Sequence, residues 1–599
     1  MNTAKSITIG GASGYWGEAS HATAQLLRTE QLDFLVYDYL AEITMSIMAR
    51  ARVKDPQAGF AADFVSAALA PNLKAIAERG IKVISNAGGV NPKACSDAVR
   101  ALLSKHGLNL RVATITGDDV LGELAEATET VDMFCGAPFP PAESLLSANA
   151  YLGAFPIAKA LDEGADIVIT GRCVDSAVAL AACIHSFGWQ VDDFDRLAAG
   201  SLAGHLIECG PQATGGNFTD WRDAGPLADI GYPLATIESE GTCILSKPPE
   251  TTGTVTPLTV GEQMLYEIGD PAAYALPDVA CDFRDVTLEQ SGDNEVTVRG
   301  VRGRAPSAQY KVSATAMDGY RAGQTFLING FDARSRAESL AQAIIDRARA
   351  RLRAVNAADF TEISTEVFGS YERGYGEVML KLAVRHDDAS AVGIFLKEMA
   401  GMGLATPAGM SIFTAGGRPK PSPVVRLWSC LIDKEKVTPR LSFDDGDGAA
   451  VQLALSVESE THAIETVDQP EPAEPSSDMI GVPLIALAVA RSGDKGDKAN
   501  IGVMARDAKY LPYIWQALSP EAVSAHFALE LEGAQDRVER FYLPGSHAIN
   551  LLLDRALGGG GIASLRQDAQ GKGFGQKALA MPVSIPVRLA QELDLERFA

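Results

Sequence analysis

The sequence predicts an α/β protein with a doubly wound parallel sheet in its N-terminal part, an α+β second region and a small α+β C-terminal domain. Three observations carry this prediction. Short apolar runs alternate with helical stretches over the first 225 residues, which is typical of a parallel sheet buried on both faces. From about Pro226 the chain becomes rich in Thr, Pro and Gly. A Pro- and acid-rich stretch, VDQPEPAEPSSD (467–478), then precedes a separate run of strands and helices.

Strands of the N-terminal sheet are expected at Ser6–Ile9, Phe34–Tyr37, Lys82–Ser85, Arg111–Ile115 and Asp166–Thr170. The clearest helix between them is KACSDAVRALLSKHG, which follows Asn91-Pro92 and ends at a glycine. These patterns place a doubly wound α/β domain at 1–225, an α+β region at 226–455, a linker at 456–480 and an α+β domain at 481–599.

In the second region, EVTVRGVRGRAP (295–306) predicts a hairpin, SRAESLAQAIIDRARARLRA (335–354) a helix, and GEVMLKLAVRHD (376–387) a strand. The C-terminal unit is expected to hold strand VPLIALAVA (482–490), loop RSGDKGDKAN (491–500), strand IGVMAR (501–506) and two helices. Strand RVERFYLPG (537–545) and helix HAINLLLDRAL (547–557) are expected to follow.

The composition excludes several classes of function. A formal net charge of −24 argues against nucleic acid or an anionic membrane surface as a partner, because both need clustered Lys and Arg. No apolar run approaches the roughly 20 residues that a membrane helix requires. The eight cysteines form no CxxC pair and lack zinc spacing. We therefore expect reduced thiols and a cytoplasmic protein.

A glycine turn follows the first expected strand, in ITIGGASGYWGE (7–18). The dinucleotide fingerprint fails because Ala12 stands where the second glycine is needed. No tyrosine has a lysine four residues on, so the acid of short-chain reductases is missing as well, and NAD(P) is not expected. Two interpretations stay open: the turn binds an anion through backbone amides, or its glycines only permit close packing. The residues concerned are Gly11, Ser13, Gly14 and Gly17.

Polar residues follow each of the five expected strands. In an open α/β sheet, ligands bind beyond the carboxyl ends of parallel strands, so these residues form a candidate active-site rim. They are Gly11 and Ser13, then Asp38, then Asn86, Gly88 and Gly89, then Asp118 and Asp119, and finally Arg172 and Asp175.

Two further stretches carry candidate chemistry. In HLIECGPQATGGN (205–217), Glu208 is a candidate base or metal ligand and Cys209 a candidate nucleophile, although a lone thiol is more often a small buried hydrophobe. Any metal would be Mg²⁺ on Asp118, Asp119 or Glu208 rather than zinc. In RSGDKGDKAN, the candidate anion ligands are Arg491, Ser492 and Lys495; the alternative is a solvated, self-neutralising hairpin.

Taken together, GGASGYWGE, SNAGGVNP, TGDDV, TGRCVDSA, HLIECGPQATGGN, AVARSGDKGDKANIG and YLPGSHAINLLLDRALGGGG resemble the acyclic terpene utilisation protein A (AtuA) family over nearly the whole chain. The resemblance implies a ferredoxin-like C-terminal domain. It also implies catabolism of branched acyclic terpenoids, or of related branched acids, as coenzyme A thioesters.

Three functions compete under this resemblance. The first is a lyase or hydratase acting on an acyl-CoA, with Asp118, Asp119 or Glu208 as base, Arg172 on a distal carboxylate, and the glycine turn on a phosphate or the thioester oxygen. The second is a non-catalytic partner subunit of a CoA-dependent enzyme. The third, an oxidoreductase, lacks its acid and its fingerprint. We expect an acyl-CoA as the small-molecule ligand, no nucleic acid, no membrane, and a homo-oligomer.

The linker generates the first testable prediction. Because 467–478 has neither apolar content nor a helical pattern, limited proteolysis should cut there before anywhere else. Gel electrophoresis should then show two stable fragments, of roughly 470 and 120 residues. A first cut within residues 1–225 would contradict the predicted domain boundaries.

Overall fold

The computed structural model describes residues 5–18, 20–126, 130–369, 374–412, 417–444, 446, 448–452, 467–471, 473, 476–561 and 563–598. Contacts within the chain divide it into two compact units. Unit 1 comprises Met1–Ala314, Trp428–Ala556 and Gly571–Ala599, and unit 2 comprises Thr315–Leu427 and Leu557–Gln570. The predicted boundaries at 225, 455 and 480 remain predictions, and much of the predicted linker lies outside the described residues.

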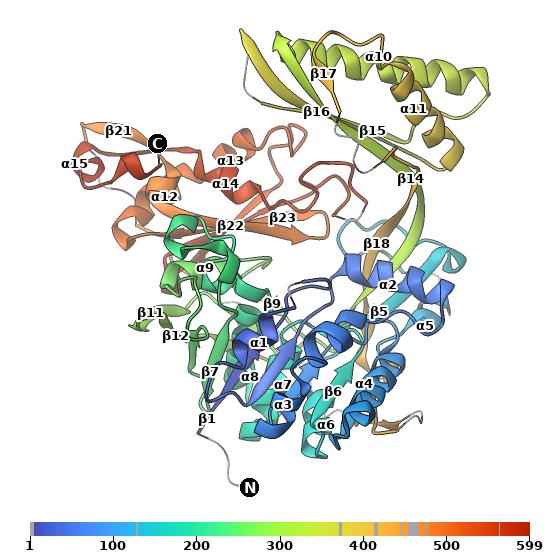
Figure 1. Ribbon diagram of the computed structural model, residues 1–599. Coiled ribbons are helices and arrows are strands. Elements are labelled where there is room, and N and C mark those ends of the chain that lie inside the picture. The colour runs from blue at the N-terminus through green and yellow to red at the C-terminus, as the bar shows by residue number, and fades with distance from the viewer. Residues whose placement is uncertain are drawn as a thin grey trace. The chain divides into compact units, whose positions relative to one another are not determined.

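The largest sheet lies in unit 1 and has 11 strands in the order β11-β12-β8-β7-β1-β2-β3-β6-β4-β19-β20 (Figure 1). Its parallel centre consists of β1 (Ser6–Gly11), β2 (Phe34–Tyr37), β3 (Lys82–Ser85), β6 (Ile167–Thr170) and β4 (Val112–Thr116). Antiparallel flanks are formed by β7 (Leu234–Glu238), β8 (Cys243–Ser246), β12 (Glu295–Arg299), β11 (Thr287–Gly292), β19 (Arg440–Ser442) and β20 (Ala449–Ala450). The fold is therefore mixed α/β, and the expected parallel sheet is only the middle of a mixed one.

Both faces of this parallel centre are covered by helices. Phe34 and Val36 belong to one hydrophobic core and Leu35 and Tyr37 to another, because successive strand residues face opposite sides. The first core includes α6 (Phe155–Asp162), α7 (Ala177–Phe187) and α8 (Phe194–Ile207). The second includes α1 (Ala22–Leu26), α2 (Glu42–Lys54), α3 (Leu73–Arg79) and α4 (Pro92–His106). Burial on both faces explains why these strands are apolar without alternation.

Helix α4 begins and ends where the sequence indicates. The Asn91 side chain accepts from the Ala94 backbone amide, Pro92 occupies the first turn, and Gly107 ends the helix in the left-handed region at φ +66°. The shorter elements of unit 1 are α5 (Leu121–Glu126), β5 (Leu145–Ala150), α9 (Pro257–Met264), β9 (Tyr274–Ala275), β10 (Ala280–Asp282) and β13 (Arg302–Arg304). The predicted 295–306 hairpin is wrong, because β12 pairs with β8 and β11 whereas β13 pairs with β10.

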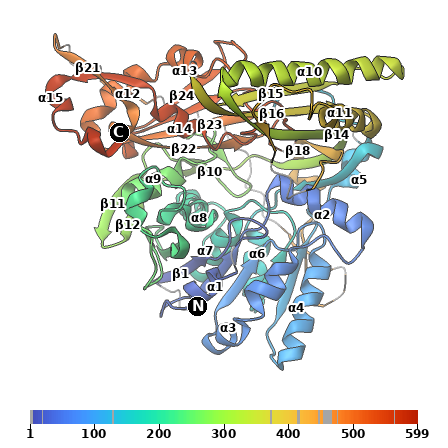
Figure 2. The ribbon, with the colours of Figure 1, turned by 45° about the horizontal axis from the view of Figure 1, so that its top comes forward.

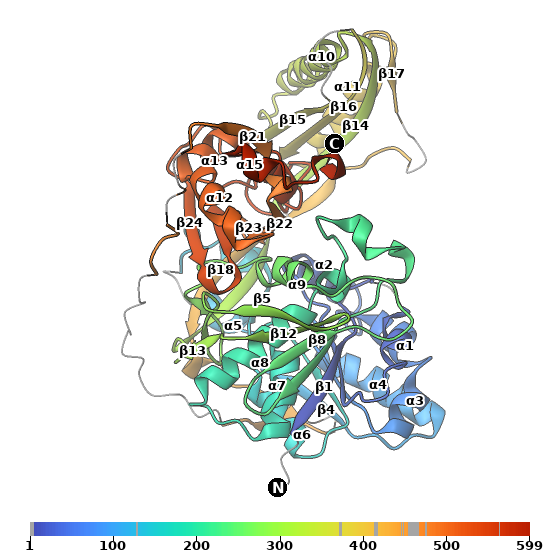
Figure 3. The same ribbon diagram turned by 90° about the vertical axis from the view of Figure 1, so that its left-hand side faces the viewer.

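The C-terminal domain has a four-stranded antiparallel sheet in the order β22-β23-β25-β24, also part of unit 1 (Figure 3). Its elements are β21 (Met479–Pro483), β22 (Ala488–Lys495), β23 (Lys498–Ala505), α12 (Leu511–Ala517), α13 (Pro520–His526), β24 (Val538–Leu543), β25 (Ala548–Leu553), α14 (Phe574–Leu579), β26 (Pro582–Pro586) and α15 (Val587–Ala590).

Two expectations fail in this domain. RSGDKGDKAN is not a loop, because β22 and β23 continue through it and leave only Gly496 and Asp497 between them. HAINLLLDRAL is not a helix, because residues 548–553 form β25 between β23 and β24. That strand is buried along its whole length, so its apolar run carries no period with which to distinguish strand from helix.

Buried and partly buried polar contacts join the C-terminal domain to the α/β domain within unit 1. Arg506 forms a two-bond pair with Asp220, at 2.5 and 2.9 Å. The Thr219 hydroxyl and the Ala490 backbone amide are 3.2 Å apart. Arg491 donates to the Gly216 carbonyl at 3.0 Å. The two domains therefore share a desolvated, directional interface rather than a loose contact.

Unit 2 is a sheet with helices α10 (Ala333–Ala354) and α11 (Ala389–Gly401) packed on one face (Figure 2). Its strands are β15 (Glu362–Phe368), β16 (Tyr375–His386), β14 (Gln309–Phe331) and β17 (Met410–Ser411), with β18 (Ser422–Asp433) also paired to β14. β14 and β18 continue from unit 2 into unit 1. The helix expected at 335–354 and the strand expected at 376–387 are both present.

The glycine turn after β1 packs against the end of α8. A Cβ on Gly11 would lie 2.3 Å from the Ile207 carbonyl oxygen, and one on Gly14 would lie 2.7 Å from the carbonyl carbon of Cys209. Backbone atoms cannot move aside as a flexible side chain can. These two glycines therefore fix the distance between the turn and HLIECG.

Gly14→Ala should destabilise the protein by roughly 1–3 kcal/mol, because the added methyl group overpacks rigid backbone. The matched control is Gly122→Ala in α5, where a Cβ meets nothing within 4 Å. Urea unfolding followed by circular dichroism measures both. Equal stability of the two variants would contradict the packing role of the turn.

Candidate functional site

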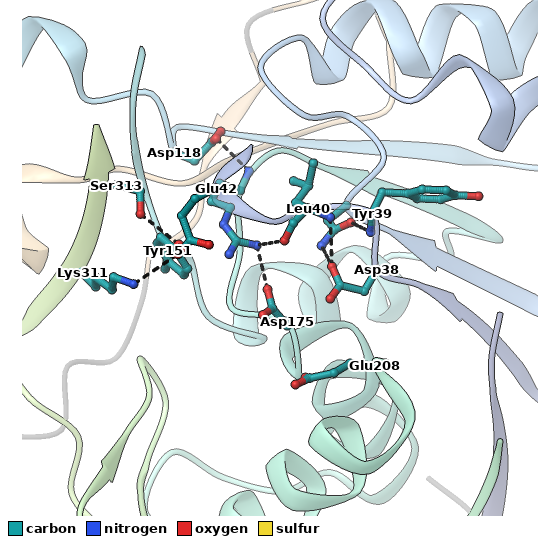
Figure 4. Close-up of polar contacts among 12 residues, drawn as sticks. Asp38, Tyr39, Leu40, Glu42, Asp118, Tyr151, Asp175, Glu208, Lys311 and Ser313 are labelled. Atoms are coloured by element: carbon teal, nitrogen blue, oxygen red, sulfur yellow. Dashed lines mark hydrogen bonds and ion pairs between the residues drawn. The ribbon is translucent and has the colours of Figure 1, made fainter. Parts of the chain in front are cut away.

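A buried arginine, Arg172, lies at the carboxyl ends of the parallel strands, just after β6. It is 2 % exposed. Its Nη1 donates to the Leu40 carbonyl at 2.9 Å and to Asp175 at 2.7 Å, and its guanidinium lies 4.0 Å from the centroid of the Tyr151 ring. Its Nε has no hydrogen-bond partner among the described residues. Figure 4 shows the acids and Tyr151 that surround this position.

Two aspartates from neighbouring strand ends share this environment. Asp38 follows β2 and is buried, accepting from Asn86 at 2.5 Å. Burial raises the pKa of Asp38 well above its ordinary value, and the nearby Asp175 raises it further, while Arg172 opposes the shift. Asp38 is therefore a carboxyl group that holds its proton unusually well, beside an Asp175 paired to arginine.

Glu208 forms a second polar pair with His205 at the end of α8. Nδ1 of His205 lies 2.9 Å from a Glu208 oxygen, and Nε2 lies 3.2 Å from the Met264 carbonyl, to which it donates. With Nε2 as donor, the Nδ1 contact requires either a protonated Glu208 or a charged imidazolium. Burial raises the pKa of Glu208, while His205 opposes the shift. The pair thus holds one exchangeable proton.

Lys495 is the cation of the site with open hydrogen-bonding capacity. It ends β22 in the C-terminal domain, is half-buried, and its ammonium makes no hydrogen bond or ion pair with any residue in the described part of the chain. Burial lowers its pKa, but Tyr274, Glu267, Glu42 and Asp175 together raise it above its ordinary value. Three donor hydrogens of a fully charged ammonium are consequently available to a ligand.

Glu42, the first residue of α2, is a further carboxylate near Arg172 and Tyr151 (Figure 4). Glu42 accepts from the Tyr151 hydroxyl at 2.8 Å and lies 3.5 Å from Lys311. Burial raises the pKa of Glu42, but Lys311 and Arg172 outweigh it and hold the pKa well below its usual range. Glu42 is therefore ionised and serves as counter-charge.

The structure separates the two adjacent aspartates of TGDDV. Asp118 is buried and accepts from the Asn149 side chain and from the Arg172 backbone amide, both at 2.8 Å. Asp119 is exposed and accepts from the Leu121 amide at 3.2 Å, at the start of α5. Asp118 thus fixes the backbone of Arg172, whereas Asp119 faces solvent.

Cys209 directly follows Glu208 and is half-buried. Burial raises the pKa of its thiol well above the ordinary value, and Glu208 and Glu267 raise it further. A thiol in such surroundings stays protonated, and a thiolate is the nucleophilic form. The environment therefore does not activate Cys209.

The predicted glycine-turn ligands are engaged within the chain. Ser13 donates to the Asp38 carbonyl at 2.6 Å, the Gly14 amide donates to Glu18 at 2.5 Å, and the Gly17 amide donates to Asp63 at 3.2 Å. Both amides therefore already bind carboxylates of the chain itself.

The remaining predicted ligands also have internal roles. The Asn86 side chain accepts a hydrogen bond from the Tyr39 backbone amide and donates one to Asp38. A Cβ on Gly88 would lie 2.5 Å from the Thr170 carbonyl, and Gly89 has φ +53°. In the C-terminal domain, Arg491 lies at the domain interface, and Ser492 donates to the Gly571 carbonyl at 2.6 Å. Among the described residues, Lys495 is thus the predicted anion ligand whose side chain has no internal hydrogen bond.

Comparison with protein families gives two matches. The model described as acyclic terpene utilisation family protein AtuA matches residues 7–443, and that of the AtuA ferredoxin-like domain matches residues 482–584. The chain belongs to the acyclic terpene utilisation AtuA family. No curated protein and no solved structure matches it. The match confirms the family expected from the motifs and the ferredoxin-like nature of the C-terminal domain.

Two further findings concern metals and membranes. Among the described residues, no three His, Cys, Asp or Glu side chains are grouped as a metal ion would require. No helix in the described part of this family member has the length and apolarity to cross a membrane.

Sequence reasoning omitted several residues that the structure brings to this place. The sequence places Asp38 and Asp175 at strand ends and His205 in the candidate stretch 205–217, but assigns them no role. It gives no place in the site to Glu42, Glu267, Tyr274 or Lys311. Asp38, which directly follows a buried strand, had the clearest signal. Glu267 and Lys311 had none, because they come from later segments that carry no motif.

Asp118 generates a pH prediction, because burial raises the pKa of its carboxyl to about 6. The folded protein binds this proton more tightly than the unfolded chain. The resulting stabilisation, roughly 2–3 kcal/mol, is complete below about pH 4 and is lost as the pH rises through about 6. Asp118→Asn should therefore flatten the fall in melting temperature between pH 4 and 7.

The control is Asp192→Asn, which replaces an exposed aspartate and should keep the wild-type slope. Differential scanning calorimetry across that pH range measures all three proteins. An unchanged slope in Asp118→Asn would show that this carboxyl does not titrate in the window.

Proposed function

We propose that this AtuA-family protein is an enzyme that moves a proton on a branched acyl-CoA, as a carbon–carbon lyase or hydro-lyase. The observation that supports it is the combination of the Glu208–His205 pair with the Lys495 ammonium, which has no partner among the described residues and whose electrostatic neighbours include Glu208. A base that takes a proton and a cation that stabilises the resulting oxyanion are the two groups such a reaction needs.

In the lyase reaction, Glu208 takes the proton of a 3-hydroxyl group. The bond between carbons 2 and 3 then breaks, the hydroxyl carbon becomes a carbonyl, and the electron pair forms the thioester enolate, which finally takes up a proton. In dehydration, the base takes the proton on carbon 2 and the hydroxyl leaves as water after receiving a proton. Both routes place negative charge on the thioester oxygen, where Lys495 would donate.

Arg172 has a different part in this proposal from the carboxylate clamp that the sequence suggested. Its Nη1 is already bound to Asp175 and to the Leu40 carbonyl, and Tyr151 lies against its face. We assign it the role of fixing the strand ends by its bonds to Asp175 and to the Leu40 carbonyl. Lys495 then remains as the cation for the substrate's oxygen.

Glu208→Gln should lower turnover by about 10²–10⁴-fold, because it removes the proton acceptor at nearly constant shape. Lys495→Met should lower it by about 10²–10³-fold, because it removes the oxyanion donor. Cys209→Ser should cost less than about 10-fold, since the surroundings of this thiol do not activate it as a nucleophile. The assay is chromatography of CoA thioesters after incubation with branched 3-hydroxyacyl-CoA and branched enoyl-CoA substrates, with and without Mg²⁺.

Lys74→Met and Glu30→Gln, both at exposed positions, are the matched controls and should keep full turnover. An active Glu208→Gln together with an inactive Cys209→Ser would favour covalent thiol catalysis instead. If the wild-type protein transforms no CoA ester, the partner-subunit function becomes the better account.

A further inference from the structure

Glu267 has an unusual backbone and lies on the segment that follows α9. Its φ is +54°, in the left-handed region that side-chain-bearing residues seldom adopt. Such a conformation costs about 1–2 kcal/mol relative to ordinary backbone and persists only where surrounding contacts impose it. The contacts responsible here belong to the C-terminal domain.

Two fully buried asparagines of the ferredoxin-like sheet hold this segment by its backbone. Asn500 on β23 accepts from the Glu267 amide at 2.8 Å and donates to the Leu265 carbonyl at 2.7 Å. Asn550 on β25 donates to the Gly269 carbonyl at 2.7 Å and accepts from Asn500 at 2.9 Å. The amides therefore satisfy the backbone of 265–269 on both sides of Glu267.

Two glycines of the same sheet permit the close approach. A Cβ on Gly493 would lie 2.4 Å from the Cγ atom of Glu267, and one on Gly502 would lie 2.3 Å from the Cβ atom of Leu265. Gly493 pairs with Asn500 across the β22–β23 ladder. Small residues and asparagines thus form one surface shaped to this segment.

The constrained backbone directs the Glu267 carboxylate to the cations of the C-terminal domain. Its oxygen lies 2.6 Å from Lys572, which also lies 3.3 Å from Asp494. Burial raises the pKa of Glu267, but Lys572 and Lys495 outweigh it, so the net shift is downward and the group is ionised. Glu267 packs against Gly493, which lies two residues before Lys495 on β22, so its carboxylate supplies a fixed negative charge on the face of the strand that carries Lys495.

We propose that Glu267 is a positioning residue of the candidate site, fixed against β22 by Asn500 and Asn550 so that its carboxylate sets the position of the Lys495 ammonium that binds the substrate. This inference deepens the proposed function and rests on it. It makes the ferredoxin-like domain an integral part of the site. On this proposal, the left-handed backbone of Glu267 has a function, because it directs the Glu267 carboxylate to the lysines of the C-terminal domain.

The first test compares two glutamates with the same backbone. Glu250 has φ +58° and is exposed to solvent. Asn is a residue that tolerates the left-handed region, so Glu267→Asn and Glu250→Asn should both keep the wild-type melting temperature within a few degrees. Glu267→Asn should lower kcat about 10–100-fold with little change in KM, and Glu250→Asn should change neither.

The second test needs no substrate. The charged and titratable groups around Lys495 are Tyr274, Glu267, Glu42, Asp175 and Glu208. Removing one carboxylate charge lowers the lysine pKa and increases the reactive neutral amine at a given pH. Acetylation with limiting acetic anhydride at pH 9, read by mass spectrometry, should label Lys495 about 3–10-fold faster in Glu267→Gln, because tenfold corresponds to one pKa unit.

The exposed Lys74 provides the internal reference rate for labelling and should not change. Asn500→Ala should accelerate Lys495 labelling in the same direction, because the carboxylate is no longer held in place. Unchanged labelling in Glu267→Gln would overturn the inference whether or not the protein is an enzyme. Faster labelling together with inert wild-type protein would instead uphold the positioning role and overturn the proposed function.

Discussion

The burial of one guanidinium group is the constraint around which this site is arranged. Arg172 is removed from water, and a buried charge is tolerated only when partners compensate it. Asp175 supplies the opposite charge, and the Leu40 carbonyl accepts a second hydrogen bond from the guanidinium. Asp118 accepts a hydrogen bond from the backbone amide of Arg172. Each partner comes from the end of a different strand or the loop after it. The positions of these strand ends are therefore coupled to one another through a single side chain.

That arrangement leaves the α/β domain with a surplus of carboxyl groups at its open edge. Burial raises the pKa values of Asp38 and Glu208, whereas Glu42 is paired with Lys311. The ferredoxin-like domain supplies the missing positive charge with Lys495 and Lys572. The interface between the two domains therefore balances charge as well as packing surfaces together. The Arg506–Asp220 pair contributes two directional hydrogen bonds to this interface.

The sequence predicted the parallel strands and helix α4 almost to the residue, because buried apolar runs, an Asn-Pro start and a terminal glycine are local signals. It failed at residues 548–553, where a fully buried strand has no period. It correctly gathered Arg172, Asp175 and Asp38 at one edge by the rule for parallel strand ends. It did not find Glu267, Asn500 or Asn550, since their meeting depends on how two distant segments dock, and no local pattern encodes that.

The order of these parts along the chain has a consequence for synthesis. Arg172 emerges from the ribosome within the first third of the polypeptide together with its partners Asp118 and Asp175, whereas Lys495 and Lys572 emerge near its end. A nascent chain that has already folded its parallel strands carries the carboxyl groups of Asp38, Asp118 and Asp175 without the two lysines of the C-terminal domain. The charges at this edge of the sheet are therefore balanced only after the C-terminal domain has been synthesised.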